Sequence, residues 1–178
     1  MTFDVIDSPV GRLIAGASHD ALQVLEFSEP ATLDARLAAV RLAAANQPLP
    51  PSAAAADLAL LEKLRLELEQ YFSGGRRTFE LPLRYSGSPF QQRVWTALRT
   101  IGYGQTASYL ELARAIGDDK AVRAVGQANG RNPIAIVIPC HRVVNANGDL
   151  GGFGGGPWRK QYLLDLERGD CLFPTIAA

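Results

Sequence analysis

The chain has 178 residues, of which 47% are hydrophobic and 20% are charged, ordinary values for a globular protein with a sizeable core. No stretch approaches the roughly 20 apolar residues of a membrane span, and the first residues lack the features of a signal peptide, so we expect a cytoplasmic protein without a membrane partner. Two cysteines are too few for a disulfide framework or a Cys-rich zinc site, and we expect no metal.

The charge is distributed unequally along the chain. Residues 1–87 carry 8 basic and 11 acidic side chains, a net charge of −3. Residues 88–178 carry 10 basic and 7 acidic side chains, a net charge of +3. A basic second half indicates a polyanionic partner, although chance also produces differences of this size.

Short apolar runs at the start of the chain predict a β-meander. Strands are expected at residues 3–7, 12–18 and 21–27, because the turn sequences SPVG and HD separate them. A helix is expected at 31–40. The Pro/Ala-rich residues 46–56 are then expected to break regular structure.

Apolar residues recur at helical spacing over residues 57–72 and predict a core-packing helix. Gly74 and Gly75 would end this helix. Residues 78–86 are expected to form a strand that leads out of the first domain. The apolar residues on the helical face are Leu61, Leu64, Leu68 and Phe72.

Helix-start signals organise the second half. Ser88 with Gln91, and Ser108 with Glu111, each fit a capping box, in which two side chains three residues apart satisfy each other's backbone N–H groups. The turn at Gly117 then leads into another helix. Helix, short glycine-containing turn, helix is the pattern of a helix-turn-helix, but also of any helical hairpin. The expected helices span 88–102, 108–116, 119–129 and, near the end of the chain, 159–169.

Cys140 and His141 stand side by side in the segment IPCHRVVN, residues 138–145. The apolar run 134–138 predicts a buried strand that stops at Pro139. Neighbouring side chains on a strand point to opposite faces, so this pair can cooperate only if the chain turns after Pro139 or a water bridges sulfur and imidazole. From these residues alone three interpretations stay open: a nucleophile with its base, a buried cysteine beside a structural histidine, and a metal site that lacks further ligands.

A series of motifs surrounds this segment. They are YFSGGRRTFELPL, SPFQQRVW, GQTASYLELARAIG, AVRAVGQANGRNP and IPCHRVV, followed by a glycine-rich loop (GDLGGFGGG, residues 148–156) and RKxxLL. Together they resemble the O6-alkylguanine-DNA alkyltransferases over residues 71–169, whereas residues 1–70 match only in general layout. The length and the lack of zinc ligands are similar to the bacterial constitutive type.

The resemblance implies a mixed α/β fold, with a ribonuclease H-like αβ domain over residues 1–87 and a helical winged helix-turn-helix domain over 88–178. It implies DNA repair by direct reversal, in which an alkyl group passes irreversibly from O6 of a flipped guanine to Cys140. O4 of thymine is a second position to test. The implied partner is double-stranded DNA carrying O6-alkylguanine, bound by a monomer that needs no cofactor. The alternatives are a non-catalytic sensor of alkyl damage and a cysteine hydrolase.

The resemblance also assigns roles to individual residues. Cys140 corresponds to the acceptor thiolate, and His141 to the base that activates it through a water. Glu167 corresponds to the acid that orients the histidine, and Asn132 to the residue that fixes the active-site turn. Tyr109 corresponds to a tyrosine that donates a proton to the base and rotates the 3′ phosphate.

Four further residues are expected to contact DNA or the substrate base. Arg123 would fill the stack that the flipped nucleotide leaves, while the Val143 carbonyl and the loop at Phe153 and Gly154 would line the guanine pocket. Phe153 stands where some relatives have a tyrosine, so a hydroxyl is missing there. Phosphate contacts from Arg93, Arg114, Arg131 or Lys160 are plausible, but none is assigned individually, and we expect most of these side chains to be solvated surface charges.

Overall fold

The computed structural model describes residues 1–28, 38 and 51–170, which belong to two compact units, Met1–Tyr85 and Ser86–Ala178. Apart from Ala38, the helix expected at 31–40 lies outside the described residues. In the described part, no helix is both long and apolar enough to cross a membrane.

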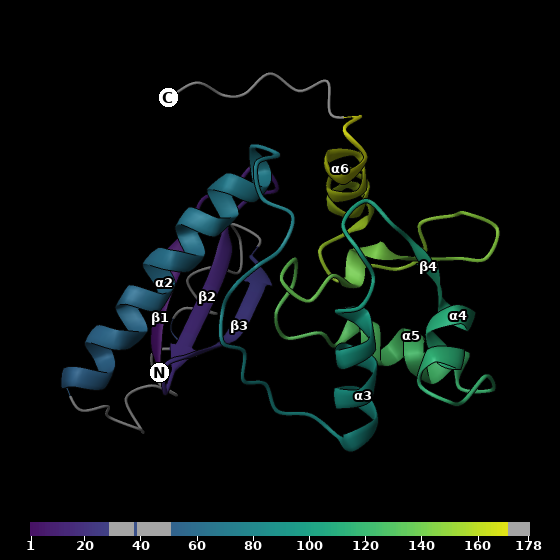
Figure 1. Cartoon of the computed structure of the whole chain (residues 1–178), viewed down its shortest axis with the longest axis horizontal. Helices are drawn as coiled ribbons and strands as arrows, with labels where there is room; N and C mark the ends of the chain where they lie inside the picture. Colours follow the sequence, from purple (N-terminus) through teal and green to yellow (C-terminus); the bar gives the residue numbers. More distant parts are fainter. Residues whose placement is uncertain (29–37, 39–50, 171–178) are drawn as a thin grey trace. The chain divides into compact units, whose positions relative to one another are not determined.

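The first unit is a three-stranded antiparallel sheet with one long helix packed on it (Figure 1). Strands β1 (Thr2–Ile6), β2 (Leu13–Ser18) and β3 (Ala21–Phe27) pair in chain order, as predicted. His19 and Asp20, with φ of 54° and 58°, form the turn between β2 and β3. Two consecutive residues at positive φ match the twist of the flanking strands, which explains why this short connection closes the hairpin.

Helix α2 (Pro51–Phe72) packs against the sheet through its leucines. It begins well before the expected residue 57, because the alanines that follow Pro51 are strong helix formers and proline is tolerated in a first helical turn. The prediction that residues 46–56 break regular structure is therefore wrong from Pro51 onward. Tyr71, rather than Phe72, is the fully buried aromatic residue at the end of the helix.

The strand expected at residues 78–86 is not formed. Among the described residues of this segment, only Leu83 pairs, in an isolated parallel bridge with Leu22 of β3. Leu22 donates to the Pro82 carbonyl (2.8 Å) and accepts from the Arg84 N–H (2.9 Å). Proline has no N–H to donate to a ladder, so the segment touches the sheet edge without extending it.

The second unit is mainly helical (Figure 1). Both predicted capping boxes are present, at Ser88 and at Ser108. The third helix starts later than expected, because Asp118 accepts the Lys120 N–H (3.2 Å) in a local turn that competes with helix formation. The helices are α3 (Pro89–Leu98), α4 (Tyr109–Ala115), α5 (Val122–Gly130) and α6 (Pro157–Arg168).

The apolar run 134–138 is buried, as predicted, but it is not a strand. It folds into tight turns closed by the Val137 N–H on the Ala135 carbonyl (2.8 Å) and the Ile138 N–H on the Ile134 carbonyl (2.9 Å). The residue between them, Ile136, has a φ of 69°, which is rare for a β-branched side chain. A continuous apolar run indicates burial but does not distinguish an extended from a turned backbone.

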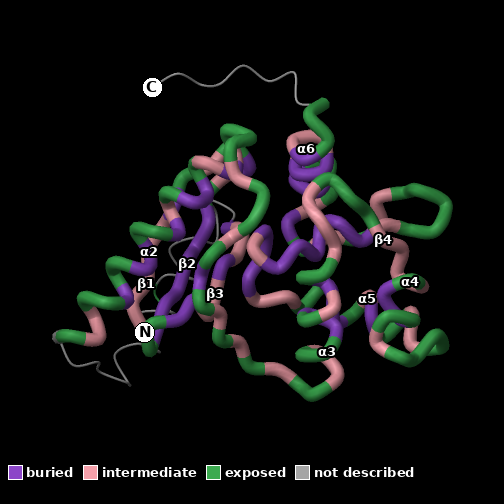
Figure 2. The backbone as a smooth tube through the Cα atoms, in the orientation of Figure 1, coloured by how far each residue is buried: buried purple, intermediate pink, exposed green. Residues whose placement is uncertain are grey.

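Two short strands connect the helices to the segment that follows these turns. Strand β4 (Ala107–Ser108) pairs in parallel with β5 (Val143–Val144). Because β4 leads directly into α4 and β5 follows Arg142 directly, this pairing joins the start of α4 to the Cys140 segment. The segment from Ile138 to Val143 and the inner face of α6 form a buried part of this unit (Figure 2).

Candidate active site

The chain turns immediately after Pro139, which is the condition that the sequence set for Cys140 and His141 to cooperate. Residues Cys140–Arg142 form a one-turn 3₁₀-helix, η1, closed by the Val143 N–H on the Cys140 carbonyl. Successive side chains on such a helix lie about 120° apart instead of on opposite faces. Cys140 is 5% exposed and His141 is fully buried.

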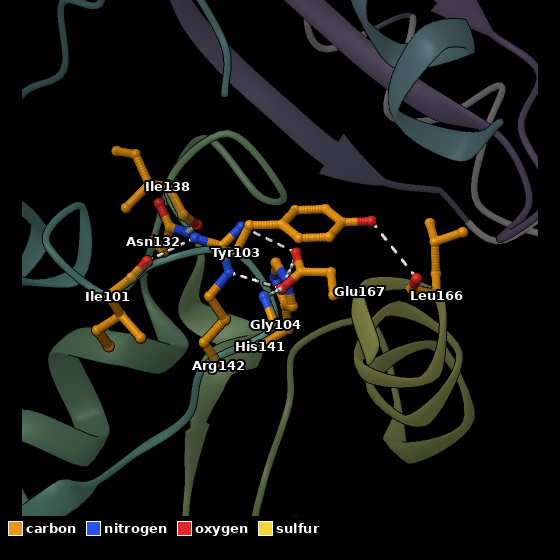
Figure 3. A network of polar contacts seen from close by, with 9 residues as sticks. All are labelled: Ile101, Tyr103, Gly104, Asn132, Ile138, His141, Arg142, Leu166 and Glu167. Carbon is orange, nitrogen blue, oxygen red and sulfur yellow. Dashed lines mark hydrogen bonds and ion pairs between the residues drawn. The ribbon is translucent and has the colours of Figure 1, made fainter. Parts of the chain in front are cut away.

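Glu167 on α6 is the hub of the polar network around this turn (Figure 3). Its Oε1 accepts from His141 Nε2 (2.9 Å) and from Arg142 Nη2 (2.9 Å). Its Oε2 accepts from Arg142 Nε (2.8 Å) and from the Gly104 backbone N–H (3.1 Å). Burial opposes ionisation of the carboxyl, but the hydrogen bonds from His141 and Arg142 outweigh it and place the Glu167 pKa well below its usual range. The hub is therefore a carboxylate that only accepts hydrogen bonds.

This carboxylate determines the tautomer of His141. Burial lowers the pKa of the imidazole, and the neighbouring charges of Arg142 and Lys160 lower it further, against the opposing effect of Glu167. The ring is therefore neutral near pH 7, and its single N–H must lie on Nε2, which faces Glu167. Nδ1 then carries a lone pair, and this buried atom has no hydrogen-bond partner among the described residues. His141 thus presents an unoccupied base inside the protein.

Arg142 received no role from the sequence, yet it holds the hub together. Besides its two bonds to Glu167, it donates through Nη1 to the Ile101 carbonyl (2.6 Å) and lies 5.9 Å from the centre of the Tyr103 ring. Paired guanidinium bonds to a carboxylate are among the strongest hydrogen bonds in proteins. Arg142 therefore fastens the loop after α3 to the end of α6 and keeps Glu167 ionised (Figure 3).

Asn132 lies beside the turn that carries Cys140. Its Nδ2 donates to the Ile138 carbonyl (2.7 Å), and its Oδ1 accepts the Ile134 N–H (3.1 Å). Burial raises the pKa of the Cys140 thiol, and a hydrogen bond from Asn132 and the charge of Lys160 partly counteract this rise. The resting cysteine is therefore a protonated thiol at neutral pH, and a base must take its proton before sulfur can attack.

Lys160 does not lie where a phosphate contact requires it. The side chain is fully buried, and Nζ donates to the carbonyls of Val143 (2.6 Å), Leu150 and Gly152 (3.5 Å). Desolvation lowers the pKa of Lys160 to about 8, while nearby Cys140 opposes the shift. Lys160 was a candidate for a phosphate contact or a solvated surface charge; it is neither, because it is buried and ties strand β5 to the glycine-rich loop.

The helical spacing of α6 would have indicated this burial. Lys160 and Glu167 lie on the same helical face as the buried residues Leu163 and Leu164, at spacings of three, four and seven. A lysine on the apolar stripe of a helix needs internal acceptors, and the carbonyls of the loop supply them.

Tyr109, the first residue of α4, lies between α5 and the glycine-rich loop. A Cβ at Gly151 would be 3.3 Å from the phenol, so this glycine makes room for it, whereas a Cβ at Gly126 would be at an ordinary contact distance of 3.8 Å from the ring. The hydroxyl reaches the Gly152 carbonyl at 3.5 Å. Burial and nearby Cys140 raise the pKa of Tyr109, while a hydrogen bond from Asn129 opposes the rise. The phenol is therefore a proton donor close to the cysteine.

The remaining expected residues lie around this centre. Val143 is buried, and its carbonyl accepts from Lys160 Nζ, so one lone pair of the expected pocket carbonyl is already engaged. Phe153 is half-buried in the loop, next to exposed Gly154, whose Cβ position lies 3.8 Å from the Gly130 carbonyl at the end of α5. Arg123 is exposed on the first turn of α5.

Comparison with known proteins agrees with this arrangement. The model of the 6-O-methylguanine DNA methyltransferase DNA-binding domain matches residues 89–169, and the model of the ribonuclease-like domain of the same enzymes matches residues 1–85. The α/β class, with a small sheet domain before a helical one, is thereby confirmed.

Curated relatives and solved structures match over nearly the whole chain. A constitutive methylated-DNA–protein-cysteine methyltransferase of Bacillus subtilis is 38% identical, covering 93% of this chain and 94% of that protein. A methylated-DNA–protein-cysteine methyltransferase of Mycobacterium leprae is 42% identical, with coverages of 94% and 92%. The crystal structure of Mycobacterium tuberculosis OGT in complex with DNA matches with a TM-score of 0.75 and 40% identity, over 94% of this chain and 93% of that one.

Proposed function

Because the chain belongs to the 6-O-methylguanine DNA methyltransferase family, we propose that it repairs DNA by moving an alkyl group from O6 of guanine to its own Cys140. It acts as a cytoplasmic monomer on double-stranded DNA that carries O6-alkylguanine. Each molecule reacts once, since the cysteine keeps the alkyl group as a thioether and no cofactor takes it away.

The observation that carries this proposal is the neutral His141 with a free Nδ1 beside a protonated, buried thiol. The thiol proton moves to Nδ1, through one bridging water, and the resulting imidazolium is stabilised by the Glu167 carboxylate at 2.9 Å. This is the arrangement of a nucleophile, a base and an orienting acid, with cysteine as the nucleophile.

The chemical step balances without any further reactant. Sγ forms a bond to the alkyl carbon while the bond between that carbon and guanine O6 breaks, and the electron pair of the broken bond remains on the base. The base then takes up one proton, for which the Tyr109 hydroxyl is the donor proposed here. The His141 imidazolium then returns its extra proton, through solvent, to the Tyr109 phenolate, so the products are an S-alkylcysteine and unmodified guanine, with both side chains neutral again.

The target base must leave the helix to reach a cysteine that is only 5% exposed. Extrusion of a paired base costs a few kcal/mol, least for a damaged base. Arg123, exposed on α5, is the side chain proposed to fill the vacated stack, while Phe153 and Gly154 form the wall of the pocket.

Two other functions are less well supported. A damage sensor that flips the base without reacting has no use for a cysteine joined to a base and an acid. A cysteine hydrolase must turn over repeatedly, which a buried thiol inside a closed turn does not favour.

Reaction of the protein with a duplex containing one O6-methylguanine tests the proposal. We expect a mass increase of one methyl group per protein, located on the Cys140 peptide, and recovery of guanine in the duplex. The Cys140→Ser variant, which keeps the size of the side chain, is the control and should bind the duplex without reacting. Binding without transfer by the wild type would favour the sensor, and repeated turnover of a thioester would favour the hydrolase.

A further inference from the structure

Asn129, near the end of α5, is a buried polar residue to which the family resemblance gives no role. It is 3% exposed and lies on the inner face of α5 with Val125 and Ala128. Its Oδ1 is buried without a hydrogen-bond partner in the described part of the chain. An apolar side chain at this position would avoid the cost of that unpaired oxygen, so packing alone does not explain the carboxamide.

The carboxamide is used on its nitrogen side. Nδ2 donates to the carbonyl of Cys140 at 3.3 Å. The same carbonyl accepts the Val143 N–H that closes η1, so Asn129 bonds to the atom that defines the first turn of the reactive segment. On the other side of Pro139, Asn132 holds the Ile138 carbonyl at 2.7 Å. Two asparagine side chains therefore grip the backbone before and after Pro139.

The position from which Asn129 reaches the turn is rigid. The buried indole Nε1 of Trp95 donates to the Ala128 carbonyl (2.9 Å) and fixes the last turn of α5 to α3. The Asn132 N–H donates to the Asn129 carbonyl (3.3 Å), so the two asparagines are also linked through the backbone. Because α5 is held in place there, the Asn129 side chain has little freedom to move and can hold the Cys140 backbone in a defined position.

The carboxamide also lies beside the second reactive group. The Tyr109 ring lies against Gly126, three residues before Asn129 on α5, where an added Cβ would be 3.8 Å from it. Asn129 also counteracts the rise in the Tyr109 pKa that burial and Cys140 cause, so its carboxamide lies close to the phenol as well as to the Cys140 backbone.

We propose that Asn129 is a positioning residue, which sets the separation of the Cys140 turn from the Tyr109 side chain and connects both to helix α5. The proposal rests on the proposed alkyl transfer. Arg123, the residue proposed to contact DNA, lies on the first turn of the same helix. Asn129 therefore also connects the helix that carries Arg123 to the backbone of Cys140.

A single-turnover experiment separates positioning from a purely structural role. The amplitude of methyl transfer gives the fraction of protein molecules that can react. The rate constant of methyl transfer at saturating duplex reports how well the reacting groups are positioned. We expect Asn129→Leu, which keeps the approximate size and removes the N–H donor, to transfer one methyl group per protein at a rate lowered on the order of 10-fold. The matched control Gln92→Leu removes an exposed carboxamide from α3 and should react at the wild-type rate.

A wild-type rate in Asn129→Leu, or a loss of amplitude at an unchanged rate, would overturn the proposal. If the leucine variant unfolds, Asn129→Ala carries the same comparison, because alanine fits the buried site and also lacks the N–H donor. A wild type that does not transfer methyl groups would refute the proposed function instead. In that case, the rate of Cys140 alkylation by iodoacetamide, which needs no DNA, would test whether Asn129 positions Cys140. An unchanged rate in the variant would reject the positioning role.

Discussion

Replacing Glu167 by glutamine keeps the shape of the hub and removes its charge. The carboxylate accepts four hydrogen bonds, two on each oxygen. A glutamine offers one acceptor oxygen and one NH₂ group. If the oxygen keeps the bonds from Arg142 Nε and Gly104, the NH₂ group faces His141 Nε2 and Arg142 Nη2, which are both donors.

His141 can relieve this conflict only by changing its tautomer. With Nε2 as acceptor, the ring proton moves to Nδ1, and the lone pair proposed to take the thiol proton is lost. General base catalysis contributes roughly 10²- to 10⁴-fold to a rate, so we expect transfer of the alkyl group to slow by about 100-fold or more. Duplex affinity should be retained, because neither residue lies on the exposed face of α5.

The same substitution lowers stability, since Arg142 keeps its buried charge and loses its partner. Breaking a buried ion pair costs about 3–5 kcal/mol, and the remaining glutamine oxygen places the expected loss near the lower end, at about 3 kcal/mol. Urea denaturation measures this loss, and single-turnover kinetics at saturating duplex measures the rate. Asp165→Asn, which removes a half-exposed carboxylate from the same helix, is the control for charge. A folded Glu167→Gln protein that reacts at the wild-type rate would refute the assignment of His141 Nδ1 as the base.

Three further predictions follow from the buried charges and the exposed arginine. Lys160→Met removes a charge that lowers the Cys140 pKa, so the pH dependence of Cys140 alkylation by iodoacetamide should move to higher pH. An unchanged pH dependence, or a shift to lower pH, would contradict this effect of the Lys160 charge. The folded-state pKa of His141 lies below its unfolded value of about 6.5, so the unfolded chain binds the proton more readily and wild-type stability should fall between about pH 7 and pH 5. Urea denaturation of His141→Gln should show a weaker fall, and an equal one would exclude His141 as its source. Arg123→Ala should slow reaction with duplex on the order of 10-fold, equivalent to about 1.4 kcal/mol, and leave iodoacetamide alkylation unchanged; equal losses in both assays would contradict a role at the DNA.

Periodicity and capping signals predicted most helices of the second unit, because these signals are local. The two capping boxes are an example, since Ser88 and Ser108 need partners only three residues away. The prediction of a strand at 134–138 was wrong, because a continuous apolar run is found both in buried strands and in buried turns. The actual turn depends on Asn132, whose side chain holds the Ile138 carbonyl from outside the run.

The site was predictable where a motif names the residue and not where tertiary contacts create the role. Cys140, His141 and Glu167 were expected together from the resemblance, and His141 and Glu167 lie 2.9 Å apart in the structure. Arg142 stood inside the quoted motif but had no assigned partner, because Ile101 and Gly104 reach the network from a distant loop. Lys160 was misplaced because its charge was weighed without the helical face on which it lies.

The buried cations change what DNA meets at the surface. Arg142, Arg159 and Lys160 are buried in the second unit, as is the carboxylate of Glu167, so the net charge of +3 for residues 88–178 shrinks to +1 among the side chains that are not buried. Each phosphate that a protein neutralises releases condensed counterions. The affinity for duplex DNA therefore falls more steeply with ionic strength as more phosphates are neutralised. A nearly neutral exterior gives a shallow dependence and short residence on undamaged DNA, which suits a molecule that must leave many intact base pairs quickly and commit itself only once.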